Sequence, residues 1–94
     1  MTITSMTALK KMPYAQAKII HYSDGSYALR SYDTIVMGVT AEGWFYVNGL
    51  YSATTRKHIS AFMRETGLGN YYTAKDLYVK NARYNIHTGE IEHL

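Results

Sequence analysis

Apolar and polar residues alternate along residues 34–40, and this is the clearest pattern in the chain. A period of two is typical of a strand with one buried face. A second run, residues 44–51, is rich in the aromatic and β-branched side chains that favour strands. Between the two runs stands a three-residue turn that ends at Gly43, and glycine adopts a positive φ without a Cβ clash. The pattern therefore predicts a β-hairpin.

Folding the chain about Gly43 determines which side chains meet across the hairpin. Val39 comes to lie opposite Phe45, and Met37 comes to lie opposite Val47. These four apolar residues form one face of the hairpin. Such a face needs a cover, because apolar surface is stabilised by removal from water.

The segment after the hairpin predicts a helix over residues 54–66. Ser52, Thr54 and Thr55 are each suitable N-cap residues, because a side-chain oxygen can accept a hydrogen bond from the first helical turn. Gly67 suits the left-handed position that ends many helices. With Thr54 as the cap, the residues that share one helical face are Ile59, Phe62, Met63 and Thr66. This face is the best cover for the hairpin that the chain offers.

Two further strands are predicted before the hairpin. Residues 15–22 and residues 27–32 flank an Asp24-Gly25 turn, which gives a three-stranded meander ahead of the helix. Residues 1–13 have no clear period, and they form either a flexible arm or an added edge strand.

The pattern weakens after Gly69. Residues 73–76 have the form of a capping box, which favours a short helix from Ala74, whereas residues 77–79 would equally suit a strand. Residues 84–94 are typical of a final extended segment around a turn.

Together these elements predict a single α+β domain over residues 1–94. Its antiparallel sheet would have three to five strands in a meander, with one main helix packed on one face. A hydrophobic content of 47% with 18% charged residues is typical of a globular chain. We find no apolar run long enough to span a bilayer and no signal-peptide core, so we expect a cytoplasmic protein without a membrane partner. The absence of cysteine excludes disulfides and thiolate metal sites.

The sequence shows no catalytic motif. A Ser-His-Asp or carboxylate-pair site could assemble in the fold, but no spacing favours one among the candidate residues, which are Asp24, Asp33, Glu42, Asp76 and the histidines. No serine stands in a nucleophile elbow, and no glycine-rich loop carries a phosphate-binding lysine. Four residues near the C-terminus could gather around a metal, but their spacing is not that of a zinc site: His87, Glu90, Glu92 and His93. Solvated tail residues explain them better. We therefore expect a binding protein, not an enzyme, with neither metal nor cofactor.

The N-terminus of the predicted helix is the first candidate site. It gathers hydroxyls, free amides and cations, and its residues are Ser52, Thr54, Thr55, Arg56, Lys57 and His58. Free N–H groups and the helix dipole favour an anion there, a phosphate especially, or an acidic partner. The N-terminal end of a helix carries a partial positive charge, so the cationic side chains here are unfavourable unless an anion is bound. This unfavourable placement of cations points to an anionic ligand. The alternative is an ordinary capped helix with solvated cations.

A second candidate surface follows the helix, where tyrosines alternate with basic residues. Its members are Tyr71, Tyr72, Lys75, Tyr78, Lys80, Arg83 and Tyr84. Aromatic platforms interleaved with cations occur in proteins that bind single-stranded nucleic acids. Ordinary tyrosine-rich surfaces have the same composition, and a net charge of +3 tolerates an anionic partner without requiring one.

Two strings in the sequence carry a resemblance to a known family. Residues 31–36 (SYDTIV) and 49–59 (GLYSATTRKHI) resemble a family of small proteins of unknown function carried by phages, prophages and plasmids. Members share an SYxTxVA pattern followed by G-x-Y/W-S-x-T-T-x-x-H-I. The resemblance covers residues 19–66, and Met37-Gly38 stands where a small residue is usual in the family.

The resemblance implies a mobile-element origin and a function by binding. Such proteins commonly inhibit host defence nucleases, as anti-CRISPR proteins do, or remodel host nucleic-acid machinery. The expected partner is then a host protein or a protein–nucleic-acid complex, and a homo-oligomer through an exposed strand edge is a further expectation. The positive charge argues against an acidic, DNA-mimicking inhibitor. The alternative function is a nucleic-acid-binding module that uses the helix N-terminus and the tyrosine–lysine surface.

Overall fold

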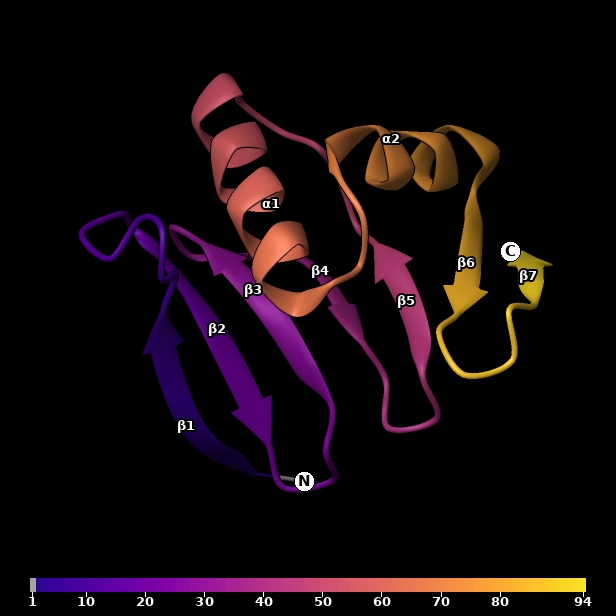
Figure 1. Cartoon of the computed structure of the whole chain (residues 1–94), viewed down its shortest axis with the longest axis horizontal. Helices are drawn as coiled ribbons and strands as arrows, with labels where there is room; N and C mark the ends of the chain where they lie inside the picture. Colours follow the sequence, from indigo (N-terminus) through magenta and orange to yellow (C-terminus); the bar gives the residue numbers. More distant parts are fainter. Residues whose placement is uncertain (1) are drawn as a thin grey trace.

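The computed structural model describes residues 2–94, in which the chain forms seven strands and two helices (Figure 1). The strands are β1 (Ile3–Ala8), β2 (Ala17–Tyr22), β3 (Tyr27–Ser31), β4 (Thr34–Val39), β5 (Trp44–Val47), β6 (Ala82–Asn85) and β7 (Ile91–His93). The helices are α1 (Ala53–Thr66) and α2 (Tyr71–Lys80).

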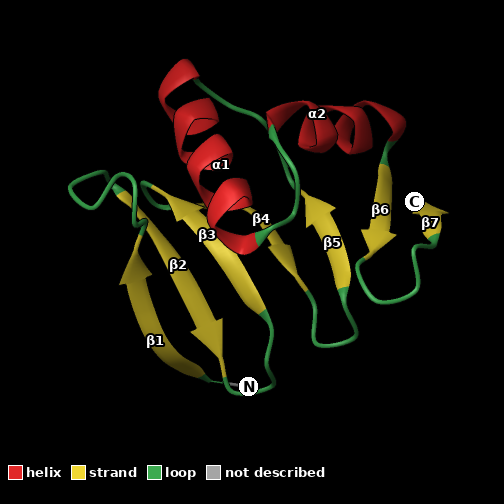
Figure 2. Cartoon of the chain, in the orientation of Figure 1, coloured by secondary structure: helices red, strands yellow, loops and turns green. Residues whose placement is uncertain are grey.

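All seven strands belong to one antiparallel sheet, and their order in space is their order in the chain. Both helices lie in the connection between β5 and β6, which are nevertheless neighbours in the sheet. They pack on the same side of it, so the molecule has one covered face and one open face (Figure 2).

The expected fold of three to five strands with one main helix is wrong. The sheet has seven strands and the described chain has two helices. The sequence of β1 shows no alternation of apolar and polar residues, because a bulge between Ile3 and Ser5 shifts the register of the strand. Of the two alternatives for this segment, the edge strand is the one that forms. β6 and β7 are too short, at four and three residues, to show an alternation in the sequence.

The predicted hairpin is confirmed in its register. Val39 pairs with Phe45 and Met37 pairs with Val47, and the turn between them has Gly43 at φ +95°. Val39, Met37 and Phe45 are fully buried under the helices, where they join a core that also includes Leu29 of β3. The hairpin therefore supplies the centre of the covered face.

Helix α1 covers this face as its sequence predicted. Ile59, Phe62 and Met63 have no exposed surface, whereas Thr66 at the end of the same stripe is half-buried. The N-cap is Ser52, whose side chain accepts a hydrogen bond from the Thr55 amide. Gly67 closes the helix in the left-handed region at φ +74°.

Helix α2 is longer than the short helix expected from Ala74. Asn70 is its N-cap, and its side chain accepts a hydrogen bond from the Thr73 backbone N–H. The Thr73 hydroxyl accepts one from the Asn70 backbone N–H in turn, so this capping box starts the helix at Tyr71. Ala74 and Leu77 turn toward the core, and the strand considered for residues 77–79 does not form. Neither helix in residues 2–94 combines the length and the apolar character needed to cross a membrane.

Candidate functional site

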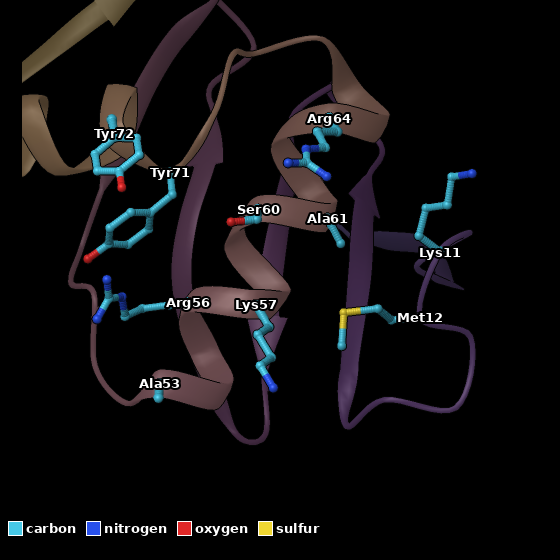
Figure 3. Close-up of a pocket in the computed structure, with 10 residues that line it drawn as sticks. All are labelled: Lys11, Met12, Ala53, Arg56, Lys57, Ser60, Ala61, Arg64, Tyr71 and Tyr72. Carbon is cyan, nitrogen blue, oxygen red and sulfur yellow. The ribbon is translucent and has the colours of Figure 1, made fainter.

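An open groove of about 580 Å³ runs along the outer side of α1 (Figure 3). Three parts of the chain enclose it: α1 itself, the loop between β1 and β2, and the first turn of α2. Its lining residues are Lys11, Met12, Ala53, Arg56, Lys57, Ser60, Ala61, Arg64, Tyr71 and Tyr72.

The α1 side of the groove follows from helical periodicity. Positions three and four apart fall on one face of a helix, and the stripe here runs from Ala53 through Lys57 and Ser60 to Arg64. The core stripe lies on the other side of the helix. Because each residue advances the helix by about 1.5 Å, Arg56 and Arg64 are attached about 12 Å apart along the groove.

The loop side of the groove is held against α1 by two anchors. Leu9 is fully buried in the core. The backbone N–H of Lys10 donates to the Oε1 atom of Glu65 at 2.7 Å, which ties the loop to the last turns of α1. These anchors bring Lys11 and Met12 to the edge of the groove (Figure 3).

The α2 side of the groove is aromatic. The guanidinium carbon of Arg56 lies 4.6 Å from the centre of the Tyr71 ring, a cation–π contact between the two helices. Tyr71 in turn meets Tyr72 edge to face, with ring centres 5.8 Å apart and an angle of 71° between the planes. Figure 3 shows Arg56 directly beside the Tyr71 ring.

The groove is strongly cationic. Four of the chain's ten basic residues line it, and among the described lining residues there is no carboxylate. Within residues 2–94, neither Lys57 nor Arg64 forms a salt bridge, whereas Lys80 and Arg83 elsewhere are paired with Asp76 and Glu92. The basic side chains of the groove thus repel one another and have no protein counter-charge, an arrangement that favours an anionic ligand.

Part of the groove lining is apolar, and we call it the floor. Met12, Ala53 and Ala61 contribute methyl groups and a thioether to it. Cations around an apolar floor suit a ligand with negative charges on its outside and a flat or apolar group between them.

A hydrogen-bonded network lies on the opposite, buried side of α1. The Oγ atom of Ser31 is 2.8 Å from Nδ1 of His58 and 3.1 Å from Oγ1 of Thr55. All three residues are buried, and the Tyr32 ring packs against the His58 ring from outside. Burial lowers the pKa of His58, so its imidazole is neutral at neutral pH.

The six residues predicted at the helix N-terminus are therefore not gathered in one site. Ser52 caps the helix, while Thr55 and His58 belong to the buried network. Thr54 is exposed in the first turn, outside the groove lining. Only two of the six line the groove, and these are Arg56 and Lys57.

The second predicted surface is dispersed as well. Tyr71 and Tyr72 join the groove, but the other five residues lie elsewhere. Lys75 and Tyr78 are exposed on α2, and Lys80 pairs with Asp76 at 3.0 Å. On β6, Arg83 lies over the Trp44 ring at 4.4 Å and binds Glu92, and Tyr84 is 38% exposed.

The C-terminal residues considered as metal ligands do not form a cluster in the described part of the chain. In the described part of the chain, no three residues with metal-binding side chains lie close enough to hold an ion. Glu92 is engaged by Arg83 at 2.9 Å, and the His87 ring packs where a Cβ on Gly43 would lie.

Sequence reasoning missed Lys11, Met12 and Arg64. Arg64 carries a detectable signal, because it lies seven and eight positions after Lys57 and Arg56 and so shares their helical face. Lys11 and Met12 carry no such signal, since only the tertiary packing of Leu9 and Glu65 brings their loop to α1.

The fold and the groove define a class of protein: an antiparallel sheet with two helices on one face and a cationic groove along the first helix. The chain belongs to a family of unknown function, DUF8033, whose profile matches residues 1–81. This range includes all the lining residues of the groove and ends before β6. No curated protein and no solved structure matches the chain.

Proposed function

We propose that this protein acts by binding nucleic acid, with the phosphate backbone held along the groove on α1. The observation that supports this most directly is the set of four basic side chains, Lys11, Arg56, Lys57 and Arg64, around one groove without a carboxylate in its described lining. Nucleic acids are polyanions, and Lys and Arg contacts to their phosphates supply most of the sequence-independent binding energy.

The spacing of the cations suits a polymer better than a single small anion. Arg56 and Arg64 are attached about 12 Å apart along α1, and Arg56 lies over the Tyr71 ring, so one phosphate would contact only part of this row of cations. A chain of phosphates can contact the cations in succession, and each contact releases counterions. The net charge of +3 also favours association with a polyanion.

Binding without a chemical step is the function that the groove favours. Its one hydroxyl from a serine, that of Ser60, has no histidine or carboxylate beside it among the lining residues. The Ser31–His58 pair resembles a nucleophile and its base only in composition, because both residues are buried between α1 and the sheet, out of reach of a substrate.

Salt-dependent binding tests the proposal. Fluorescence anisotropy with a labelled oligonucleotide, measured between about 50 and 200 mM salt, should give a slope of log K against log salt of about −2 to −3. Lys57→Glu and Arg64→Glu should each weaken binding roughly tenfold and reduce the slope by about one.

Lys18→Glu is the matched control for these variants. It makes the same change in net charge, but Lys18 alternates with the core residues Ala17 and Ile19 and therefore lies on the open face of the sheet. It should weaken binding much less than Lys57→Glu does. Equal losses in the two variants, or an affinity that does not depend on salt, would contradict binding in the groove.

A second candidate function is inhibition of a host protein, as in anti-CRISPR proteins. The patterns at residues 31–36 and 49–59 support a mobile-element origin. The exposed edge strand β1 supports a protein partner, since Ile3 and Met6 leave 53% and 43% of their surfaces open to solvent. A high-salt pull-down from host lysate tests this candidate, provided that Met6→Lys abolishes the capture and Lys57→Glu does not.

A further inference from the structure

We propose that the groove selects single-stranded nucleic acid, with one base stacked on the exposed ring of Tyr72 and the neighbouring phosphates at Lys57 and Arg64. This inference rests on the proposed function and adds the kind of nucleic acid and the division of labour among the lining residues.

Tyr72 has the position and the rigidity of a stacking platform. Although it is an aromatic residue, 73% of its surface is exposed. Its backbone N–H donates to the Oδ1 atom of the N-cap Asn70 at 2.9 Å, which fixes it in the first turn of α2. Its ring edge packs against Tyr71, so the ring is oriented while its surface remains open. A fixed aromatic face loses little entropy when a base stacks on it.

The other aromatic ring of the groove is already engaged. Arg56 lies over Tyr71 at 4.6 Å, so that guanidinium supports the aromatic pair. Lys57 and Arg64 have no comparable contact among the described residues and remain available to phosphates. Among the described residues, the groove therefore combines an occupied cation–π pair, the exposed ring of Tyr72 and three unpaired cations, Lys11, Lys57 and Arg64.

A single strand can use all of these groups, and a duplex cannot. In a duplex the base faces are stacked on one another, and only phosphates and groove edges are presented to a protein. The apolar floor formed by Met12, Ala53 and Ala61 would then face a charged backbone with no gain. In a single strand one unstacked base can lie on Tyr72 and another over the floor, while the neighbouring phosphates reach Lys57 and Arg64.

The experiment compares two ligands with the same phosphates. One is a labelled thymidine oligonucleotide of about 12 residues, a length within the site sizes of single-strand binders, and the other is its abasic counterpart. Wild type, Tyr72→Ala and Tyr72→Phe are titrated with both ligands. Tyr78→Ala is the control, because it removes another exposed tyrosine of α2 that does not line the groove.

The wild type should bind the thymidine oligonucleotide about tenfold more tightly than the abasic one, which is the effect expected from one stacked base. Tyr72→Ala should lose this preference, whereas Tyr72→Phe and Tyr78→Ala should keep it. Circular dichroism confirms that each variant is folded.

Failure of this inference is distinguishable from failure of the proposed function. Salt-dependent binding of both oligonucleotides with equal affinity would overturn base stacking and leave phosphate binding in place. Tighter binding to a duplex of the same sequence, or a base preference that survives Tyr72→Ala, would also overturn it. If neither ligand binds at low salt, the proposed function itself fails.

Discussion

The Nδ1 atom of His58 lies 2.8 Å from the Oγ atom of Ser31, and this contact joins the buried side of α1 to the end of β3. It places a titratable group in the interior, directly behind the helical face that carries the groove. The groove lies on the outer side of the same helix, so loss of this interface should also disturb the groove. We therefore expect the protonation of His58 to affect both the stability of the fold and the site.

Stability should fall as the pH is lowered through the range in which His58 titrates. Burial lowers its pKa in the folded protein below the ordinary value of 6.5. Above pH 6.5 the imidazole is neutral in both states and the full stability is present. At lower pH the unfolded chain binds the proton first, so the free energy of unfolding decreases down to the folded pKa. Urea unfolding at neutral and at mildly acidic pH measures this loss.

His58→Gln should remove much of that pH dependence, at the cost of a lower stability at neutral pH. His93→Gln serves as the comparison, since His93 is exposed on the edge strand β7. If the slope of stability with pH is the same in His58→Gln and in wild type, the buried imidazole is not its source.

Ser31→Ala should destabilise the protein by about 1–3 kcal/mol, because buried polar atoms of His58 and Thr55 lose their shared partner. Ser5→Ala, a change on the exposed strand β1, should stay within about 0.5 kcal/mol of wild type. Denaturant titration of both variants gives the two values. A Ser31→Ala variant as stable as Ser5→Ala would mean that the network contributes nothing to the docking of α1.

Gly43→Ala should cost more than Gly25→Ala. Both glycines have a positive φ, +95° and +89°, so alanine strains the backbone at either turn by about 1–2 kcal/mol. Only at Gly43 would the added Cβ also collide with the ring of His87, whereas at Gly25 it meets open space.

The additional cost at Gly43 should disappear when the same change is made in a His87→Ala background. Thermal unfolding of the single and double variants isolates this coupling. Equal costs at Gly43 and Gly25 in the presence of His87 would show that the turn, not the packed ring, sets the penalty.

Lys18→Glu should stabilise the protein by a few tenths of a kcal/mol. Lys18 and Arg30 are directly opposite across β2 and β3, and like charges in that position destabilise a sheet. Within residues 2–94 neither forms a salt bridge, so a glutamate would replace repulsion by attraction. The melting temperature should rise slightly, and Lys18→Gln should give about half of the gain. A lower melting temperature in Lys18→Glu would contradict the cross-strand repulsion.

The sequence was informative where a structure depends on neighbouring residues. The alternation of the hairpin and the turn at Gly43 were enough to pair Val39 with Phe45, and the spacing of Phe62 and Met63 was enough to turn them inward. The same local rules failed at β1, where a bulge interrupts the alternation. They failed again at β6 and β7, which are stabilised by pairing and not by their own pattern.

The candidate site was predicted less completely, because it depends on contacts between distant parts of the chain. Arg56 and Lys57 were identified from their helix, and Tyr71 and Tyr72 from their composition. That all four meet in one groove depends on the packing of α2 beside α1. Lys11 lies at the groove because Leu9, two residues earlier, is buried in the core. No local pattern in the sequence relates Lys11 to a helix so far along the chain.

Mapping the oligonucleotide on the protein by NMR is the most direct measurement of whether the groove is a nucleic-acid site. Isotope-labelled protein is titrated with a thymidine oligonucleotide at low salt, and the backbone amide shifts are followed. We expect the largest changes around Lys11, Lys57, Arg64 and Tyr72, reversed by added salt. Changes confined to the open face around Lys18 and Arg30, or to the β1 edge, would contradict binding in the groove.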